Sequence, residues 1–344
     1  MREIPLNKVL GCLAGIAIGD AMGMPSAGFT PEEIRFRFGE ITRFLDAPDD
    51  HPLHSGLKAS QVTDDTELTL LVADMIIEDR RPSAEGMAKR IVEWTARKNL
   101  LSTNLLGPST TRAIRELMEG KDPRQTGKFG TTNGSAMKIA PIGIIAADNL
   151  RRLSLEVEET CRPTHWTSVA ISGACSIAFA INEALQPNSS VERVLRASSR
   201  GASAGAELGK RVPSPSIAKR IELTLKLVSG CKTPSQAAKI LYDYIGSDIS
   251  CVDSIPTVVG LFAAARGDLQ KAIFAAANMG GDTDTIGSMV GALCGAFSGI
   301  GSISPILVEQ VEETNNLGLE KWALALQRLA NERARAGSMM ESSS

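Results

Sequence analysis

The sequence is poor in aromatic residues and in histidine, and it carries no excess of positive charge. Phe, Trp and Tyr make up 4% of its 344 residues, there are three histidines, and the formal net charge is −2 at pH 7. Three histidines leave little for a zinc site. Without a basic field, the chain lacks the electrostatic attraction on which nucleic-acid binding rests. We therefore expect no nucleic-acid partner and no zinc centre.

Patterns that direct a chain to export or to a membrane are also lacking. Met1–Asn7 has no basic-then-apolar pattern, and the six cysteines show no Cys-x-x-Cys spacing, so free thiols and a cytoplasmic location are expected. One uncharged run, Thr285–Val308, is long enough to cross a bilayer. It contains several glycines and is interrupted by Pro305. We therefore expect a buried helix there, and no membrane partner.

Glycine, in contrast, is abundant and regularly spaced. The chain has 31 glycines and 43% hydrophobic residues, which indicates helices packed closely on small side chains. Two apolar segments carry glycine at every fourth position: Gly11, Gly15, Gly19 and Gly23, and then Gly287, Gly291, Gly295 and Gly299. Residues four apart lie on one face of a helix. We predict that these two helices pack together, or against the same partner, at the centre of an all-α fold.

Amphipathic periodicity and capping residues predict helices along most of the remaining chain, with no strand-rich region. Helices are predicted after Thr30-Pro31 and Thr63, and over 81–97, 108–120, 168–185, 219–228, 234–244, 254–265, 269–278 and, as one last helix, about 307–334. Residues 198–209 are small and polar, and we expect a mobile connection. Residues 1–335 are expected to form one domain, followed by a disordered tail over 336–344.

Two acidic clusters stand at predicted helix starts. One is Thr63-Asp64-Asp65, and the other is Asp282-Thr283-Asp284-Thr285, preceded by two glycines. Oxygen ligands suit Mg²⁺, Mn²⁺ or Ca²⁺ rather than zinc. Each cluster alone can equally be a helix cap, with Thr63 and Thr285 at the N-cap positions and the acids favoured by the helix dipole. Together they offer four carboxylates and two hydroxyls, a donor set for two divalent ions.

Three further polar segments are candidates for ligand contacts. Gly107-Pro108-Ser109-Thr110 offers free N–H groups and hydroxyls at a helix start, where anions bind. Gly127–Lys138 is rich in glycine and hydroxyls and could wrap a phosphate or a ribose, although it is neither a P-loop nor a dinucleotide fingerprint. His165 could contact a ligand or act as an acid or base. Each segment also has an ordinary structural interpretation, as a cap, a turn or the first turn of a helix.

In their order and spacing these motifs resemble the ADP-ribosylglycohydrolase family. The matching segments are 11–15 with 19–23, 63–66, 133–137, 164–165 and 280–285, and the resemblance spans about Leu10 to Ala296. It implies an all-α, roughly orthogonal helical bundle with two Mg²⁺ or Mn²⁺ ions. It also implies cleavage of an N- or O-glycosidic bond at the anomeric carbon of a ribose, in a small ribosyl compound or an ADP-ribosylated protein.

The resemblance implies a role for each matching residue. The implied metal ligands are Thr63, Asp64, Asp65, Asp282, Asp284 and Thr285. The residues implied to contact or line the substrate's diphosphate and ribose are Ser109, Thr110, Asn133, Gly134, Ser135 and His165. Asp64 or Asp65 is the candidate catalytic base for the attacking water, and carboxylates near the sugar would stabilise an oxocarbenium-like transition state.

One position departs from the family pattern. Many members carry a glutamate soon after the first Gly-Asp-Ala-x-Gly, where this chain has Ala27. The missing acid favours a small N-riboside over an ADP-ribosylated protein, unless the loop Asp46–His54 supplies a replacement. Two other interpretations stay open. One is a binding protein that keeps the fold and the metals without turnover, and the other is a helical scaffold whose acids only cap helices. The oligomeric state is left open as well.

Overall fold

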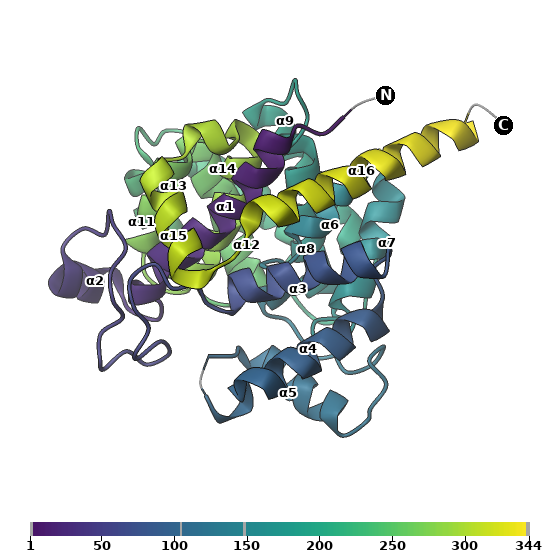
Figure 1. Ribbon diagram of the computed structural model, residues 1–344. Coiled ribbons are helices and arrows are strands. Elements are labelled where there is room, and N and C mark those ends of the chain that lie inside the picture. Colours follow the sequence, from purple (N-terminus) through teal and green to yellow (C-terminus); the bar gives the residue numbers. More distant parts are fainter. Residues whose placement is uncertain (1–2, 104, 147–148, 342–344) are drawn as a thin grey trace.

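The computed structural model describes residues 3–103, 105–146 and 149–341 (Figure 1). These residues form sixteen α-helices and four short 3₁₀ helices, and no β-strand occurs among them. The all-α class predicted from the sequence is confirmed. The elements are α1 (Leu6–Gly23), η1 (Met24–Ser26), α2 (Pro31–Phe38), α3 (Asp64–Glu78), α4 (Ala84–Lys98), η2 (Leu100–Ser102), α5 (Pro108–Met118), η3 (Asn133–Ser135), α6 (Ala140–Ile145), α7 (Leu150–Cys161), α8 (Ser168–Ala184), α9 (Val191–Gly205), α10 (Ile217–Val228), α11 (Pro234–Tyr244), α12 (Cys251–Ala265), α13 (Leu269–Ala277), α14 (Thr283–Ser298), η4 (Ile300–Ser302), α15 (Pro305–Asn315) and α16 (Leu319–Glu341).

The two glycine-striped helices, α1 and α14, pass side by side through the centre of the fold. A Cβ atom placed on Gly15, Gly19 or Gly291 would lie less than 3.0 Å from a backbone carbonyl of the facing helix. Only glycine permits this approach, which compensates for its low helix propensity through packing. The prediction that the two helices pack together is confirmed. Since α14 lies near the C-terminal end of the chain, this pair joins its two ends.

The close approach of α1 and α14 makes the glycines sensitive to any added side chain. We expect Gly291→Ala to lower the free energy of unfolding by about 3 kcal/mol, because its methyl group would meet the Gly15 carbonyl and force the helices apart. Urea unfolding measures the change. Gly301→Ala is the matched control, since no atom lies within 4 Å of the position of its added Cβ. Equal effects of the two substitutions would contradict close packing at Gly291.

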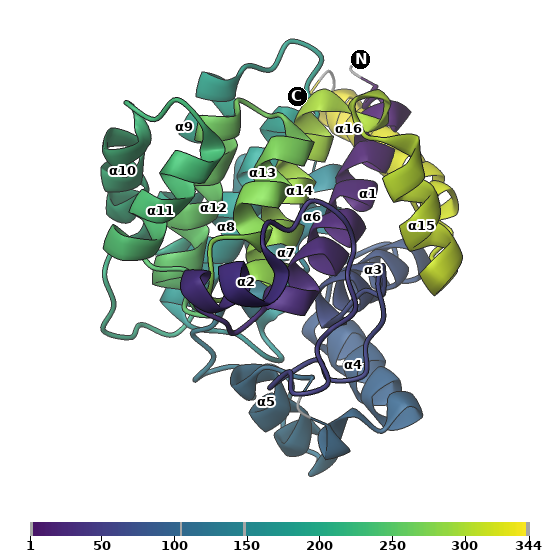
Figure 2. The ribbon, with the colours of Figure 1, turned by 90° about the vertical axis from the view of Figure 1, so that its left-hand side faces the viewer.

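The other helices surround this central pair and cross one another at several angles (Figures 1 and 2). In Figure 2, α9 to α12 lie on one side of α1 and α14, and α15 and α16 lie on the other. Helix α3 contacts α1, α14 and α16, and α4 and α5 extend beyond it at one end of the molecule. The N-terminal ends of α3 and α14 therefore meet near the C-terminal end of α1.

One helix of the described residues is long and apolar enough to cross a membrane, and it is a core helix. In the stretch Leu6–Ser26 the most apolar 18-residue window has a mean hydropathy of 1.4, but 94% of that window is buried inside the protein. The uncharged run Thr285–Val308, which is also long enough to cross a bilayer, is divided between α14, η4 and the start of α15. Residues 285–296 of this run are buried, as expected.

Helix α14 begins earlier than predicted. Asp282 occupies the N-cap position and Thr283 is the first helical residue, so the expectation that Thr285 is the N-cap is wrong. Gly280 and Gly281 have φ of 87° and 79°, a backbone conformation that suits glycine. This glycine turn leads directly to Asp282, and the helix begins at the next residue, Thr283. Thr285 consequently lies in the first turn, facing the acidic residues of α3.

The expected mobile connection over 198–209 is wrong, because α9 continues to Gly205. Its small residues serve packing rather than flexibility. A Cβ on Gly201 would approach the Cys175 carbonyl, and one on Gly205 would approach the Ile171 carbonyl, both on α8. Helices α8 and α9 therefore pack as α1 and α14 do, on small side chains.

The expected last helix over about 307–334 is two helices, α15 and α16. Asn316 and Gly318 have φ of 51° and 66°, and this left-handed conformation ends α15. Helix α16 then continues to Glu341, into the segment 336–344 for which a disordered tail is predicted. Residues 342–344 lie outside the described residues.

Candidate functional site

Five aspartates from three helices meet at the centre of the molecule. Asp20 lies in the last turn of α1, Asp64 and Asp65 begin α3, and Asp282 and Asp284 begin α14. The hydroxyl of Thr285 donates to Asp65 Oδ2 at 3.2 Å and so connects α14 with α3. The two acidic clusters of the sequence therefore form one group of carboxylates, here called the acidic cluster.

Asp20 is a member of this cluster that the sequence did not identify as a site residue. It is fully buried. Its carboxylate accepts hydrogen bonds from the backbone N–H groups of Thr63 and Thr66, at 3.0 and 3.1 Å, and from both hydroxyls, at 2.8 and 2.6 Å. Asp20 thus caps the start of α3 from another helix and orients Asp64 and Asp65. The available signal was a single acid in an otherwise apolar helix, next to a glycine of the stripe.

Most other carboxylates of the cluster are held by neutral donors or by histidine. His54 Nε2 lies 2.8 Å from Asp284 Oδ2, and Asn133 Nδ2 donates to Asp282 Oδ2 at 2.5 Å. Asp65 Oδ1 is buried without a hydrogen-bond partner. Asp64 is half-buried, and no described side chain donates to its carboxylate. Asp64 is therefore the acid that is least engaged by the protein.

Burial and like charge raise the pKa of most of these acids. Burial, followed by the charges of Asp284 and Asp20, raises the pKa of Asp64 to about 7. Burial raises the pKa of Asp20 to about 6, and burial with the surrounding acids raises the pKa of Asp65 and of Asp282 well above its usual range. Five carboxylates so close together, three of them buried and two half-buried, are unfavourable as anions unless positive charge accompanies them.

Asp284 behaves differently because of His54. Burial acts to raise the pKa of Asp284, but the hydrogen bond and the charge of His54 outweigh it, so the pKa lies below its usual value. Burial acts in turn to lower the pKa of His54, and the hydrogen bond to Asp284 outweighs it and raises that pKa. His54 comes from the loop between α2 and α3, and it both orients Asp284 and places one titratable ring at the cluster.

The donor set of the acidic cluster fits hard divalent cations. Its side chains offer only oxygen atoms, the described Lys and Arg residues form no ion pair with it, and one buried oxygen of Asp65 is free to bind a ligand. Among the described residues, no three His, Cys, Asp or Glu side chains already form a metal cage. The hydrogen bonds to His54, Asn133 and the threonine hydroxyls account for this, because they turn carboxylate oxygens toward the protein. Ion binding would therefore require small side-chain rotations.

We expect the protein without divalent ions to lose stability as pH rises from about 5 to about 8. The pKa of Asp20 and of Asp64 in the folded protein, about 6 and about 7, lies above the usual value of 3.8. Between those values the native state binds more protons than the unfolded state, so the free energy of unfolding falls as pH rises. Mg²⁺ or Mn²⁺ at the cluster would remove this penalty, and the ion should raise the melting temperature more at pH 8 than at pH 5.

Thermal unfolding with a chelator and with each ion, over this pH range, measures the effect. Asp64→Asn is the control, because it removes one titrating group of the cluster and should flatten the pH dependence. A melting temperature that rises with pH in the chelated protein would contradict the expected sign.

A cavity of about 190 Å³ opens beside the acidic cluster. Its lining includes Asp64, Asp65, Asp282, Asp284, Thr285, His54, Thr110, Asn133 and Gly134. Thr110 comes from the start of α5, and Asn133 and Gly134 come from the glycine-rich loop. Three of the residues expected at the substrate therefore do line a cavity next to the acids. Thr63 does not line this cavity, and its hydroxyl donates to Asp20.

The other three residues expected to contact the substrate lie outside the lining of this cavity. Ser109 is buried at the start of α5, and the Ser135 hydroxyl donates to the Ala170 carbonyl. His165 is fully buried, and its two ring nitrogens lie 2.9 Å from Thr132 Oγ1 and 2.8 Å from Thr164 Oγ1. His165 thus supports the glycine-rich loop from beneath.

The glycine-rich loop is tightly seated on that histidine. A Cβ on Gly134 would lie 2.8 Å from His165 Cε1, so only glycine fits at this position. The fully buried Lys138 donates to the Gly134 carbonyl and to Thr164 Oγ1. Burial lowers the pKa of this lysine. The N–H of Asn133 is fixed by the Ile249 carbonyl at 2.8 Å. The loop is therefore a rigid wall of the cavity.

A group of cations, here called the cationic cluster, adjoins this wall. Lys210 Nζ, Lys128 Nζ and Arg112 Cζ lie 4.3, 5.4 and 5.6 Å from the ring centroid of Phe129, which is 51% exposed. Two buried nitrogen atoms of Arg112 have no hydrogen-bond partner. No ion pair joins these three cations to an acid of the described residues. They come from three separate segments, so no local pattern predicts that they gather here.

The position that lacks the family glutamate is also part of the described structure. Ala27 is buried, and the following N–H of Gly28 donates to the Gly281 carbonyl. The loop expected as a possible replacement brings His51 and His54 together, with ring centroids 5.1 Å apart. Of the two, only His54 lines the 190 Å³ cavity. The loop therefore places a histidine, and no acid, in this cavity.

Comparisons with known proteins agree with this architecture. The sequence model for ADP-ribosylglycohydrolase matches residues 1–338. The chain is 32% identical to the protein YegU of Escherichia coli (strain K12) over 333 residues, covering 95% of this chain and 98% of YegU. It is 26% identical to the ADP-ribosylhydrolase ARH3 of Gallus gallus, covering 88% of each chain. A solved structure titled "ADP-ribosylglycohydrolase-related protein complex" is similar with a TM-score of 0.71 at 23% identity, covering 94% of this chain and 98% of that one. At that identity the likeness shows the fold alone.

Proposed function

The chain belongs to the ADP-ribosylglycohydrolase family, whose members are glycoside hydrolases, and from this premise we propose that it is a hydrolase dependent on two divalent cations. Its substrate is a ribosyl compound, and water replaces the group bonded to the anomeric carbon of the ribose. The observation that carries the proposal is the acidic cluster, in which buried aspartates of α1, α3 and α14 meet and, among the described residues, only His54 forms an ion pair with them. A helical scaffold would have no physical reason to gather them.

The arrangement of charge around the cavity supports an ADP-ribosyl substrate. The cationic cluster and the start of α5 suit a diphosphate, since cations and free N–H groups bind phosphate oxygens. The acidic cluster, with Mg²⁺ or Mn²⁺, suits the vicinal hydroxyls of a ribose. Thr110, Asn133 and Gly134 line the cavity together with the acids, and Arg112 and Phe129 stand within a few residues of them on α5 and in the glycine-rich loop. The expected contacts of Ser109, Ser135 and His165 are proposed as indirect, through the positions of α5 and the glycine-rich loop.

Divalent ions held by Asp64, Asp65, Asp282, Asp284 and the hydroxyls of Thr63 and Thr285 would polarise a water molecule and the ribose hydroxyls. Asp64 accepts one proton from the attacking water as its oxygen bonds to the anomeric carbon. The bond from that carbon to the leaving nitrogen or oxygen breaks, and the leaving atom gains a proton from Asp64 or from solvent. Carboxylates around the sugar stabilise the positive charge of the transition state. Asp65 is the alternative base, but Thr63 and Thr285 engage its Oδ2 atom.

Two substrate classes fit this chemistry, and Ala27 favours one of them. A small ribosyl compound needs no acid at this position if its leaving group departs readily, whereas an ADP-ribosylated protein in this family usually meets a glutamate there. We therefore propose a small-molecule substrate first and an ADP-ribosylated protein second. A binding protein without turnover is the remaining alternative, in which the same cavity holds ADP-ribose.

The test is hydrolysis by the purified protein with Mg²⁺ or Mn²⁺. The panel contains ADP-ribosyl-arginine and ADP-ribosyl-serine peptides, ADP-ribose and common nucleosides, with products followed by mass spectrometry. We expect product from at least one substrate, and loss of that product with a chelator and in the double variant Asp282→Ala, Asp284→Ala. Metal binding and ADP-ribose binding without any product would instead support the binding protein.

A further inference from the structure

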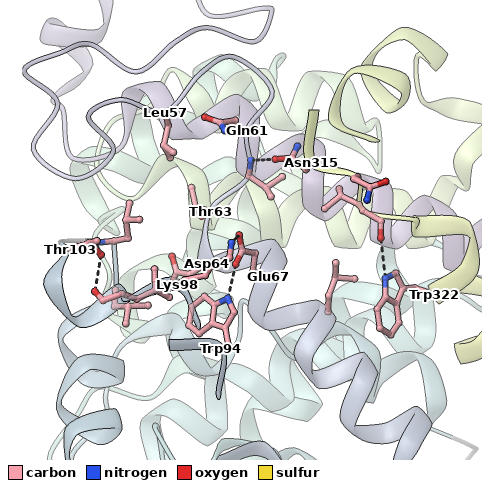
Figure 3. A pocket seen from close by; sticks show the side chains of 17 residues that line it. Leu57, Gln61, Thr63, Asp64, Glu67, Trp94, Lys98, Thr103, Asn315 and Trp322 are labelled. Atoms are coloured by element: carbon pink, nitrogen blue, oxygen red, sulfur yellow. Dashed lines mark hydrogen bonds and ion pairs between the residues drawn. The ribbon is translucent and has the colours of Figure 1, made fainter. Parts of the chain in front are cut away.

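A second, larger cavity of about 630 Å³ lies next to the acidic cluster (Figure 3). It shares Asp64, Leu105 and Leu106 with the smaller cavity. Its walls come from the start of α3, the end of α4 and the connection between α15 and α16. The volume is in the range of about 300–1,000 Å³ that is usual for small-molecule pockets. Asp64 therefore lines two cavities, and a molecule bound at this carboxylate has room on both sides.

Glu67, Lys98 and both tryptophans in the walls of the larger cavity already have partners in the protein. Glu67 accepts hydrogen bonds from Trp94 Nε1 at 2.6 Å and from Lys98 Nζ at 2.5 Å, one at each carboxylate oxygen (Figure 3). Trp322 Nε1 donates to the Leu317 carbonyl at 3.1 Å. The charge of Glu67 is thus neutralised, and both indole N–H groups are satisfied. A ligand would find no unpaired carboxylate here apart from Asp64.

The remaining surface of the cavity is mostly apolar. Asn315, on the opposite wall from Trp94 in Figure 3, accepts from the Val62 N–H at 3.1 Å and donates to the Ser60 carbonyl at 2.7 Å. The rest of the lining combines the neutral polar side chains of Gln61, Thr63, Thr103 and Asn316 with a larger set of aliphatic and aromatic ones: Leu57, Val62, Leu70, Leu100, Leu105, Leu106, Leu317 and the two tryptophans. Indole faces and branched aliphatic side chains suit a planar apolar group, which can stack on the tryptophans.

The order of the sites along the molecule assigns a part of the substrate to this cavity. The glycine-rich loop that carries Thr132 and Gly134 of the smaller cavity also carries Phe129 and Lys128, and Arg112 follows Thr110 of that cavity by two residues on α5. The three cations line neither cavity, but neither α5 nor the glycine-rich loop contributes to the larger one. An ADP-ribosyl compound consists of an anionic diphosphate, a ribose and an aglycone, in that order. With the diphosphate near the cationic cluster and the ribose at the acidic cluster, the aglycone extends past Asp64 into the larger cavity.

We propose that the 630 Å³ cavity is the aglycone pocket, and that the leaving group of the substrate is an uncharged, planar aromatic group. This proposal rests on the proposed function as a ribosyl hydrolase. A guanidinium group in this cavity would need a carboxylate of its own, but Lys98 occupies that of Glu67, and Asp64, the other acid of the lining, is the base at the ribose in the proposed function. A peptide segment would leave its backbone groups unpaired against leucine and indole surfaces. The pocket accordingly selects against arginine-linked and protein-linked substrates.

The test compares three ADP-ribosides that differ only in the aglycone: 2-naphthyl, methyl and arginine. Corrected for spontaneous hydrolysis, kcat/KM of the wild-type protein should be highest for the naphthyl compound. Leu317→Trp fills the pocket, and it should lower kcat/KM for the naphthyl substrate about 10-fold or more while changing that for the methyl substrate little. Leu223→Trp, at an exposed leucine of α10, is the control. Equal losses on all substrates, or no loss, would overturn the aglycone pocket.

A second variant changes the charge of the pocket. Lys98→Met leaves Glu67 with an unpaired charge facing the cavity, so kcat/KM for the arginine substrate should rise relative to the naphthyl substrate by about 10-fold. An unchanged ratio would overturn the role of the Glu67–Lys98 pair in selecting an uncharged aglycone.

Calorimetric binding of free 2-naphthol separates failure of the pocket from failure of the proposed function. Binding to the wild type and to Leu223→Trp, weakened about 10-fold in Leu317→Trp, supports the pocket even if no riboside is hydrolysed, in which case the proposed function fails alone. Absence of naphthol binding would overturn the pocket even if turnover is observed.

Discussion

Asp64→Asn is expected to lower ribosyl hydrolysis about 10³-fold while the fold is retained, because a well-placed general base contributes about 10²–10⁴-fold. Asp64 is the carboxylate of the cluster that no described side chain engages, and it lines both cavities. Burial and its acidic neighbours raise its pKa to about 7, which suits proton transfer near neutral pH. Asparagine keeps the volume and removes the charge, so the loss reports on chemistry rather than on packing. The measurement is kcat/KM with saturating Mn²⁺.

A stability measurement distinguishes this role from a structural one. In the chelated protein at about pH 8, Asp64→Asn should raise the melting temperature, since it removes one of several buried like charges. A residue needed for folding would lose stability together with activity. Asp243→Asn, at an exposed aspartate of α11, is the control and should change neither quantity. Activity of Asp64→Asn within 10-fold of the wild type would rule out Asp64 as the principal base.

Asp20→Ala is expected to lower the free energy of unfolding by about 4 kcal/mol, and to weaken Mn²⁺ binding by about 10–100-fold, the range typical of residues that orient metal ligands. The change removes the acceptor of two backbone N–H groups and two hydroxyls, from Thr63 and Thr66, in a fully buried position. The first turn of α3 would lose its cap, and Asp64 and Asp65 would no longer be held in place. Urea unfolding and calorimetric titration with Mn²⁺ measure the two effects.

Another aspartate provides a matched control for Asp20. Asp268 caps α13, accepting from the Lys271 N–H at 3.1 Å, and it lines neither cavity. Asp268→Ala should lower the free energy of unfolding by only about 1 kcal/mol, as for an ordinary N-cap, and should leave Mn²⁺ binding unchanged. If Asp20→Ala resembled Asp268→Ala in both measurements, the role of Asp20 in positioning the cluster would be refuted.

Local sequence signals predicted the helices well where their ends have chemical markers. Thr30-Pro31 and Thr63 start α2 and α3 as expected, because a threonine oxygen accepts a backbone N–H in the first turn. The predictions of helix ends were wrong where no strong capping residue marks the end. Helix α15 ends at Asn316 in a left-handed conformation, for which asparagine is only a weak sequence signal. The small residues of α9 resemble a loop by composition, although they pack against α8.

The site residues also divide into those that local sequence identifies and those that only tertiary contacts identify. The acids and threonines at positions 63–65 and 282–285 were recognisable because the donor type and the helix start are both encoded within a few residues. Asp20 and the large cavity were not, since their function depends on which segments become neighbours. Lys138 and His165 were expected near a ligand or a loop, but burial beneath Gly134 makes them its supports.

By itself, the sequence determined the helical class, the four-residue glycine spacing that brings α1 and α14 together, and the oxygen-rich chemistry of the two acidic motifs. These properties follow from periodicity and from side-chain type, which act over a few residues. Only the tertiary structure decided that Asp20 caps α3, that His54 binds Asp284, that three cations gather at Phe129, and that Asp64 lines two cavities. Those properties arise from contacts between segments far apart in the chain, and such contacts are fixed by the packing of the whole core.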